Sequence, residues 1–487
     1  MVSDFETRLF IDGEFRLPHS GKQFDLFNPA TSKQIGSVYE AGVEDVDDAV
    51  ESASQAFETW SETPASERGQ WLHRLADKLS ENVEEMSRLE ALTMGRPMHN
   101  DFTIPWAIEI LRYFANRASD IQGETSLSDP SLFGMTVRQP FGVTAAIIPW
   151  NTPILMLSMK IGPALAAGNT MVLKTSEKSP LSCLVVARCM KEIGFPRGVL
   201  SILSGFGRPC GEALAKHMDI RKLAFTGSTA TGKAIKKAAA ESNLKNVTLE
   251  LGGKSPLIIF EDADLAKAAV DAANSIMVVS GQSCMASSRV YVEDSRALDF
   301  IELVKKEITK IGVSGDPLAK GTLRGPQADH LQYERILSFL DVARQEKLNV
   351  VLGGDKENKA GYYIQPTVIF EAPDNSRLIK EEIFGPVLCV STFTDEADVL
   401  RRANDTEYGL YASVYTRDIV RALRVAKKLQ AGSVGINVTS PTTSLDLPFG
   451  GWKESGEGRE LGKHALDSWT ELKTILIGLP GDLKGAR

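Results

Sequence analysis

The sequence GVTAAII at residues 142–148 marks a change in the pattern of this 487-residue chain. Four more short apolar runs follow, separated by amphipathic segments, at residues 171–174, 199–203, 222–225 and 247–250. Apolar runs that alternate with helical segments are typical of βαβ units, whose parallel strands are buried on both faces. The same alternation returns at residues 256–260, 289–292, 387–393, 412–415 and 433–437. The pattern therefore predicts two α/β domains.

The region before this alternation has a different period. From residue 44 to residue 121 apolar side chains recur at helical spacing, as at Val46, Ala49, Val50 and Ala53. This repeat predicts a helical scaffold.

The composition argues against several classes of protein. The net charge is -8 and the basic residues are scattered, so no nucleic-acid partner is expected. The longest apolar stretch, residues 153–173, is interrupted by Lys160, Gly162 and Pro163, which predicts a buried helix and strand and no membrane span. The five cysteines form no CxxC pair, and no signal peptide is recognisable. These features predict a cytoplasmic location.

Cys284 lies within the sequence GQSCMASSR at residues 281–289. Small neighbours leave room for a substrate carbon to approach the sulfur, and Gly281 allows a tight turn that exposes it. The alternative is a small buried hydrophobe, the commoner role of a lone cysteine. Glu250 favours the catalytic interpretation, because it ends an apolar run just before a glycine pair and supplies a candidate base.

The sequence GSTATGKA at residues 227–234 nearly matches a phosphate-binding loop. Ala234 replaces the Ser or Thr that would hold magnesium, which argues against a triphosphate. The same strand, glycine and helix arrangement suits the pyrophosphate of a dinucleotide. The sequence GFGRPCG at residues 205–211 is spaced one residue wider than the usual dinucleotide fingerprint, and a simple turn is the alternative.

Lys174 and Glu177 follow the second apolar run, at the edge of the sheet where such folds bind ligands. The alternative is two solvated side chains. No HExxH, CxxC or clustered Cys/His set is present, so no metal is expected.

Further motifs give the chain a family resemblance. They are PWN at 149–151, FTGST at 225–229, EEIFGP at 381–386 and PFGGWKESG at 448–456. With the cysteine and glutamate windows, their order resembles the aldehyde dehydrogenase superfamily over nearly the whole chain. The resemblance implies two Rossmann-like α/β domains and a small β oligomerisation arm. By the same resemblance the NAD-binding domain comprises residues 1–121 and 143–252, the catalytic domain 253–467, and the arm 122–142 and 468–487.

The resemblance also implies roles for individual residues. Cys284 would attack the aldehyde, Asn151 and the Cys284 backbone N–H would hold the oxyanion, and Glu250 would activate water. Lys174 would help set the charge around the thiolate. The cofactor contacts would be Ile148, Trp150, Lys174, Glu177, Gly207, Gly211, Phe225, Thr226, Gly227, Ser228, Leu251, Gly252, Glu382 and Phe384.

The expected reaction is the NAD(P)-dependent oxidation of a small-molecule aldehyde to its carboxylic acid through a cysteine thiohemiacetal and thioester. NAD is expected over NADP, because Glu177 accepts bonds from ribose hydroxyls and repels a 2′-phosphate. Three alternatives remain open: a dehydrogenase that passes the acyl group to coenzyme A, a cysteine esterase, and a non-catalytic binding protein on the same fold.

Two segments carry expectations about assembly and selectivity. Residues 122–139 are polar and rich in turns, which indicates either a surface hairpin or an arm. Such an arm, together with a strand at 472–477, would join subunits into a homodimer or homotetramer.

Thr152 stands where the family commonly has a bulky aromatic, and Met156, Met159 and Met285 are flexible. A roomy pocket for aromatic or medium-to-long aliphatic aldehydes is therefore expected. Thr152 as a simple helix cap is the alternative.

Overall fold

The first large sheet carries the five predicted apolar runs of the first alternation. The computed structural model describes residues 5–479, and within them this sheet has the order β19-β11-β10-β7-β8-β9-β1-β2. Its parallel strands are β7 (Val143–Ile147), β8 (Thr170–Lys174), β9 (Leu200–Leu203), β10 (Lys222–Thr226) and β11 (Asn246–Glu250). Antiparallel strands β1 (Leu9–Ile11), β2 (Glu14–Arg16) and β19 (Gly456–Glu457) complete its edges.

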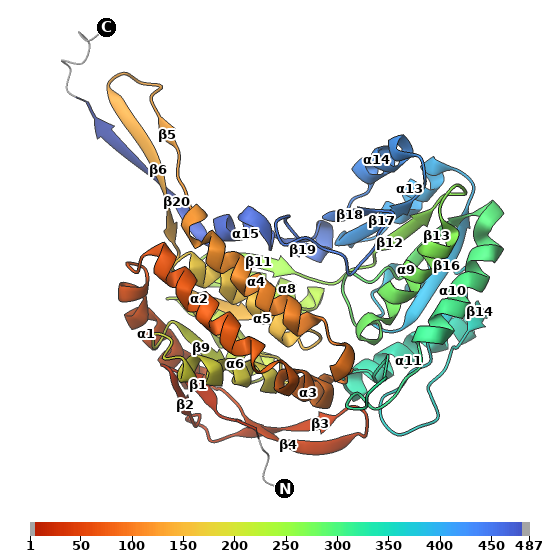
Figure 1. The fold of residues 1–487 in the computed structure, drawn as a ribbon, viewed down its shortest axis with the longest axis horizontal. Helices are drawn as coiled ribbons and strands as arrows, with labels where there is room; N and C mark the ends of the chain where they lie inside the picture. The colour runs from red at the N-terminus through yellow and green to blue at the C-terminus, as the bar shows by residue number, and fades with distance from the viewer. Residues whose placement is uncertain (1–4, 480–487) are drawn as a thin grey trace.

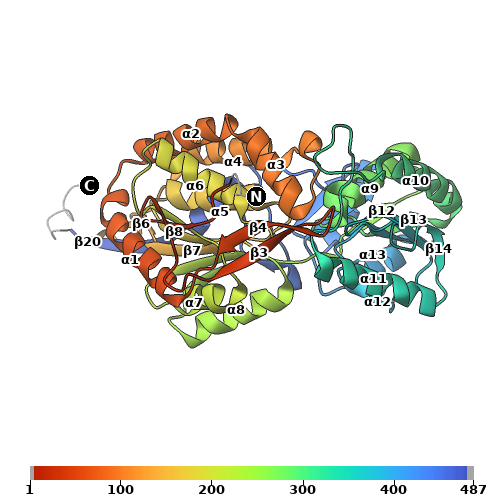
Figure 2. The same ribbon diagram turned by 90° about the horizontal axis from the view of Figure 1, so that it is seen from below.

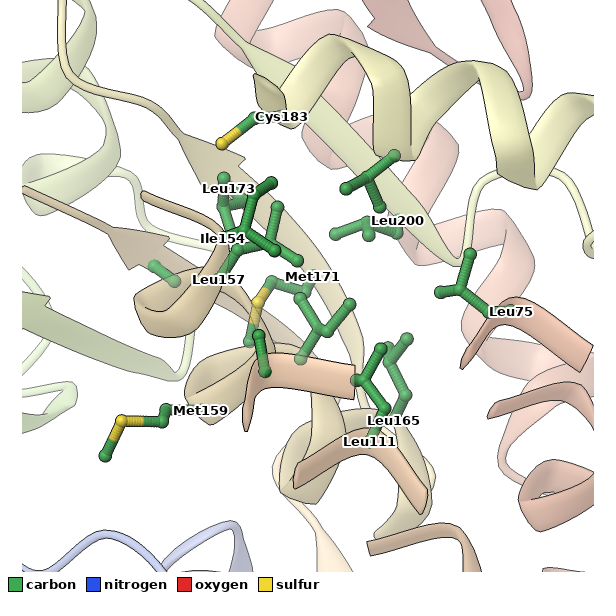
Figure 3. Packing of buried hydrophobic residues seen from close by; sticks show 14 of the residues in the cluster. Leu75, Leu111, Ile154, Leu157, Met159, Leu165, Met171, Leu173, Cys183 and Leu200 are labelled. Atoms are coloured by element: carbon green, nitrogen blue, oxygen red, sulfur yellow. The ribbon is translucent and has the colours of Figure 1, made fainter. Parts of the chain in front are cut away.

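Helices cover both faces of this sheet, which explains why its strands are apolar on both sides. One face packs against α1 (Val43–Trp60), α7 (Glu212–Lys216) and α8 (Thr229–Glu241). The other packs against α2 (Ala65–Ser80), α3 (Val83–Met94), α4 (Thr103–Arg117), α5 (Pro153–Ala166) and α6 (Leu181–Glu192). Figure 2 shows the two helical layers. In Figure 3, Ile154 and Leu157 of α5 lie against Leu173 of β8, whereas Met159 points away from this group.

The second large sheet has the order β14-β15-β16-β13-β12-β17-β18 within the described range. Its strands are β12 (Pro256–Ile259), β13 (Arg289–Glu293), β14 (Asn349–Leu352), β15 (Thr367–Phe370), β16 (Val387–Phe393), β17 (Tyr411–Tyr415) and β18 (Ser433–Ile436). Helices α9 (Leu265–Met277) and α10 (Ala297–Ile311) cover one face. The other face packs against α11 (His330–Gln345), α12 (Arg377–Lys380), α13 (Glu396–Asn404) and α14 (Ile419–Lys428). The predicted α/β class with two Rossmann-like halves is confirmed (Figure 1).

The chain returns to the first sheet earlier than the predicted end of the catalytic domain at residue 467. Strand β19 pairs with β11, and Leu251 N donates a hydrogen bond of 2.9 Å to Ser455 O. Gly456 permits this approach, since a Cβ there would overlap the carbonyl of Leu249. Helix α15 (Gly462–Ser468) then leads to the last strand. Residues 456–457 thus pair with the sheet assigned to the NAD-binding domain, whereas Trp452 N donates to Gly409 O at 2.8 Å in the second half of the chain.

The predicted arm is a small antiparallel sheet that projects from the body (Figure 1). It consists of β5 (Thr125–Ser126), β6 (Leu132–Pro140) and β20 (Thr470–Gly478). The strand predicted at 472–477 lies inside β20, which pairs with β6 of the same chain. Residues 480–487 of the predicted arm, and residues 1–4 of the predicted first domain, lie outside the described residues.

The remaining elements are short. Strands β3 (Gln23–Asn28) and β4 (Lys33–Tyr39) form a separate antiparallel pair. Single helical turns lie at Met98–Asn100, Ala118–Asp120, Gly207–Gly211, Val278–Gly281, Asp294–Arg296 and Lys453–Ser455. No helix between residues 5 and 479 combines the length and apolar character needed to cross a membrane.

Candidate active site

A cavity of about 780 Å3 brings together residues from both halves of the chain. Most of the predicted site residues line it: Trp150, Asn151, Thr226, Gly227, Ser228, Glu250, Leu251, Gly252, Cys284, Glu382 and Phe384. Asn151 follows β7, Glu250 ends β11, and Cys284 follows α9. Three distant segments therefore meet at one cavity.

An unusual turn carries Cys284 into the cavity. Val279, Ser280 and Gly281 have φ of +50°, +56° and +77°, and the left-handed region is strained for β-branched valine. Side chains hold the turn, since Gln282 Nε2 donates to Val279 O at 2.9 Å and Ser280 Oγ donates to the carbonyl of Gly325 at 2.6 Å. A Cβ at Gly281 would overlap the carbonyl of Gly385. The tight turn predicted at Gly281 is confirmed.

The Cys284 thiol is partly exposed on its cavity side and is enclosed by protein elsewhere. Burial raises its pKa to about 12, and the carboxylates of Glu382 and Glu250 act in the same direction. The backbone N–H groups of Cys284 and Met285 act against this shift. With this raised pKa the thiol is protonated at neutral pH, so it must lose its proton before it can attack an aldehyde.

Glu250 is suited to act as a general base at this cavity. Burial raises the pKa of its carboxyl to about 8, although Lys160 and Arg459 lower it. Its Oε2 has no hydrogen-bond partner among residues 5–479, and the residue lines the cavity. A buried carboxylate with a free oxygen and a pKa near neutrality can take up and release protons during a reaction.

Two residues that the sequence did not indicate stand beside Glu250. Lys160 of α5 forms a buried ion pair with Glu460, and burial lowers the pKa of this lysine to about 8. Glu460 also lines the cavity. Their separation of 300 residues left no local pattern by which to pair them.

Hydrogen bonds hold both the side chain and the backbone of Asn151. Its side-chain Nδ2 donates to Gln282 O at 2.9 Å, and Arg96 Nη1 donates to the backbone carbonyl of Asn151 at 3.3 Å. Arg96 is itself buried against the carboxylates of Glu90 and Asp101. Because an amide nitrogen carries two hydrogens, one remains to donate to a developing oxyanion.

Trp150 and Phe384 form an aromatic corner at the cavity, with ring centroids 5.4 Å apart and planes at 86°. Glu382 lies beside them, and its Oε1 accepts a hydrogen bond of 2.9 Å from Gly253 N. Burial raises the pKa of Glu382 to about 7. An apolar corner suits a flat aromatic ring, and a carboxylate beside it can accept hydrogen bonds from the hydroxyls of an attached ribose.

Helix α8 begins where a dinucleotide pyrophosphate is expected. Ser228 is its N-cap and accepts a hydrogen bond of 3.3 Å from Thr231 N. Free N–H groups at such a helix end attract phosphate. Phe225, in contrast, is buried with its ring against Gly227, and its predicted contact with the cofactor stays a prediction.

The other predicted cofactor residues gather beyond the cavity, near the carboxyl ends of β7, β8 and β9. Ile148 N donates to Lys174 O at 3.1 Å, and a Cβ at Gly211 would lie 3.8 Å from Lys174 Cε. Gly207 and Glu177 stand in the adjoining turns. Lysine, carboxylate and glycines at strand ends fit an adenosine ribose and diphosphate.

Lys174 does not reach the thiol. It does not line the cavity that holds Cys284, and its Nζ donates to Thr175 O at 2.8 Å. Burial lowers the pKa of its ammonium group. The ammonium of Lys174 is directed to its own strand end, and its predicted effect on the charge around the thiolate stays a prediction.

Several cavity residues escaped the sequence analysis. Phe102, Thr103 and Trp106 come from the start of α4, and Leu155 comes from α5. Gln332, Arg335 and Tyr408 lie on the side of Glu382 and Phe384. For the α4 residues, the only sequence signal was the apolar helical period, which does not distinguish a core position from a cavity wall.

No group of three or more His, Cys, Asp or Glu side chains in the described part of the chain could hold a metal ion.

The comparisons with known proteins agree with this site. Residues 15–475 match the family described as the aldehyde dehydrogenase family. An aldehyde dehydrogenase of Emericella nidulans is 45% identical over 469 residues, which cover 96% of this chain and 94% of the relative. Aldehyde dehydrogenase 1A1 of Homo sapiens is 44% identical over 476 residues, with 97% and 95% covered.

Two solved structures are similar to this chain over nearly its whole length. The NAD+ complex of an aldehyde dehydrogenase from Bacillus cereus has a TM-score of 0.96 and 42% identity, with 98% of each chain covered. An indole-3-acetaldehyde dehydrogenase with NAD+ has a TM-score of 0.95 and 39% identity, with 98% of this chain and 97% of that chain covered. The chain belongs to the aldehyde dehydrogenase family. It is an oxidoreductase that oxidises aldehydes to acids with NAD.

Proposed function

We propose that Cys284 is the nucleophile, Asn151 an oxyanion donor and Glu250 the general base of this oxidation. The observation that carries the proposal is that these three side chains line one cavity although they come from three separate segments. The thiolate adds to the aldehyde carbon, while Asn151 Nδ2 and the Cys284 backbone N–H stabilise the developing oxyanion. When bound, NAD supplies the hydride acceptor. The product on Cys284 is a thioester.

Glu250 then removes a proton from water, and the hydroxide attacks the thioester to release the carboxylic acid and the thiol. The buried Lys160 lies close enough to lower the pKa of Glu250, and it pairs with Glu460. This pair supports a route by which Glu250, whose pKa burial raises to about 8, loses its proton before it activates water.

The cofactor residues divide into two groups. We assign Lys174, Glu177, Gly207 and Gly211 to the adenosine half, and the N-terminus of α8 to the pyrophosphate. We assign Trp150, Glu382 and Phe384 to the nicotinamide half, because they line the cavity that holds Cys284. A transfer of the acyl group to coenzyme A would not require a buried base beside the thiol, so Glu250 favours water as the acceptor.

The aldehyde class follows from the cavity walls. Thr152 lines the cavity and occupies the N-cap position of α5, yet its side chain makes no capping hydrogen bond. Met156, Met159 and Met285 add flexible apolar surface. Trp106 of α4 supplies an aromatic wall on another side. We therefore propose aromatic or medium-to-long aliphatic aldehydes as substrates.

The Thr152→Phe variant tests this substrate class. A ring at this position fills space that bulky aldehydes occupy, so their kcat/KM should fall by about 10-fold or more, while acetaldehyde changes by less than about 2-fold. Steady-state NADH formation with a graded aldehyde panel measures this. Thr152→Ser, which leaves the space open, is the matched control. Equal losses across the panel, or a wild-type preference for acetaldehyde, would contradict the proposal.

We propose that the arm joins copies of this chain into a homodimer or homotetramer. Strand β20 is an edge strand of its sheet, and Leu472, Leu476 and Ile477 on it are 57%, 63% and 44% exposed. A long, apolar edge strand in water is prone to pair with another chain. Free thiols at all five cysteines support the cytoplasmic location, which stays a prediction.

Removal of the residues after Ser468 is expected to lower the oligomer mass, because it deletes β20 and its exposed edge. Light scattering coupled to size exclusion measures the mass, and replacement of both Leu472 and Leu476 by lysine provides a milder variant with β6 still paired. An unchanged mass in both variants would rule out the arm as the contact.

A further inference from the structure

Five buried hydroxyl groups connect the segment after the nucleophile to a wall of the cavity. Thr439 Oγ1 accepts a hydrogen bond of 2.7 Å from Ser413 Oγ and shares another of 2.7 Å with Ser287 Oγ. Ser440 Oγ lies 2.5 Å from Ser275 Oγ, which in turn accepts from Ser287 N at 2.9 Å. All five side chains are buried. We call this set the hydroxyl network.

The network joins two functional segments. Ser287 lies three residues after Cys284, and Ser275 lies in α9, which leads to the nucleophile turn. Thr439 and Ser440 follow β18 and come directly before Pro441, Thr442 and Thr443, which line the cavity. We call residues 438–447 the wall loop. The network therefore ties the wall loop to the segment that carries the nucleophile.

The nucleophile turn and the wall loop differ in how many contacts outside the hydroxyl network hold them in place. Asn151 binds Gln282 O, Ala328 N donates to Gln282 Oε1 at 2.8 Å, and Gly281 packs against Gly385, so the nucleophile turn has supports apart from the network. The wall loop has fewer, among them the hydrogen bond of 3.0 Å from Tyr411 Oη to Thr442 O. Loss of the network should therefore displace the wall loop and leave the nucleophile in place.

We propose that Thr439 and Ser440 are positioning residues that set the selectivity for bulky aldehydes by holding the wall loop at its distance from Cys284. The inference rests on the proposed function, because it takes the cavity next to Cys284 as the aldehyde site. An aldehyde long enough to reach Thr442 and Thr443 binds well only when the wall loop keeps its distance from the Cys284 thiol. Acetaldehyde contacts only the region around Cys284, so its binding does not depend on the position of the wall loop.

The Thr439→Val variant tests this role. It keeps the shape of the side chain but removes the oxygen that two buried serines use, which leaves both without their partner. The KM for a bulky aldehyde such as phenylacetaldehyde should rise by about 10-fold, the factor that corresponds to one buried hydrogen bond. Its kcat, the KM for acetaldehyde and the alkylation rate of Cys284 by iodoacetamide should change by less than about 2-fold, since the nucleophile stays in place. Thr439→Ser, which restores the hydroxyl, should restore selectivity.

Thr367→Val is the matched control. Thr367 is buried as Thr439 is and also makes two hydrogen bonds, to Gln365 O at 2.9 Å and from Gly354 N at 3.0 Å, but it lies in β15 and bonds no residue of the wall loop. It should lower Tm as Thr439→Val does, without a change in selectivity. Should Thr439→Val not fold, Ser440→Ala, which removes a single bond, is measured in the same way.

Equal effects on both aldehydes, the same selectivity loss in Thr367→Val, or no restoration by Thr439→Ser would overturn the inference and leave the proposed function intact. Turnover without Cys284 would overturn the proposed function, whatever the selectivity of the Thr439 variants.

Discussion

The Cys284→Ala variant is expected to lose aldehyde oxidation almost completely, with kcat reduced by at least about 10,000-fold. No other cysteine lines the cavity, so no thioester can form there. NADH formation measured at 340 nm with an aldehyde panel tests the loss. The fold should persist, because the substitution removes one sulfur from a side chain that is already partly exposed.

Two controls make this result specific to the nucleophile. Thermal melting and a titration with NAD should give wild-type values for Cys284→Ala, since this side chain is assigned to the aldehyde and not to the cofactor. Cys189→Ala, at a buried thiol in α6, should retain oxidation. Turnover that survives in Cys284→Ala, with Cys189→Ala also active, would exclude the thioester route.

The Glu250→Gln variant should stop the reaction one step later, at the thioester. An amide cannot take a proton from water, so the steady-state rate should fall by about 100- to 10,000-fold. An acyl-enzyme should accumulate and appear by intact mass spectrometry as the mass of the acyl group on Cys284. An unreduced rate without any acyl-enzyme would refute the role of Glu250 in deacylation.

The pH dependence of the wild-type enzyme gives a second measure of the same group. The base acts when deprotonated, and burial raises the pKa of Glu250 to about 8. The rate of deacylation should therefore increase as the pH rises through about 8 and level off above it. Glu250→Asp, which keeps a carboxylate, should retain a pH-dependent increase at a lower rate, whereas Glu250→Gln should lose it.

The strands of the two alternations and two of the proposed reacting side chains, Cys284 and Glu250, could be predicted from local sequence, whereas Asn151 was indicated by the family resemblance. Residues 143–148 are apolar apart from Thr144 because β7 is buried on both faces, and β8 to β11 repeat the pattern. Strands β14 and β15 escaped prediction, although β9, β12 and β18 are equally short. Within the described residues no helix lies between them, so they fall outside the alternation of apolar runs and amphipathic segments that predicts βαβ units.

Residue type and spacing alone also placed Cys284 among small residues and Glu250 at a strand end. They did not show that the backbone before Cys284 passes through three consecutive left-handed residues. Nothing local favours that conformation at Val279, and it persists only because Gln282 and the backbone of Gly325 hold it. The same holds for Lys174, whose position at a strand end was predictable but whose ammonium direction was not.

The sequence by itself determined the α/β class, the order of the strands in the two alternations, and the candidate thiol of Cys284 and carboxylate of Glu250, because apolar period and side-chain type are local properties. Only the tertiary structure decided the proton affinities of the site, the pairing of Lys160 with Glu460 across 300 residues, and the contact of Ser275 with Ser440 across 165. Burial and long-range contact depend on how distant segments pack together, and no local pattern records that packing.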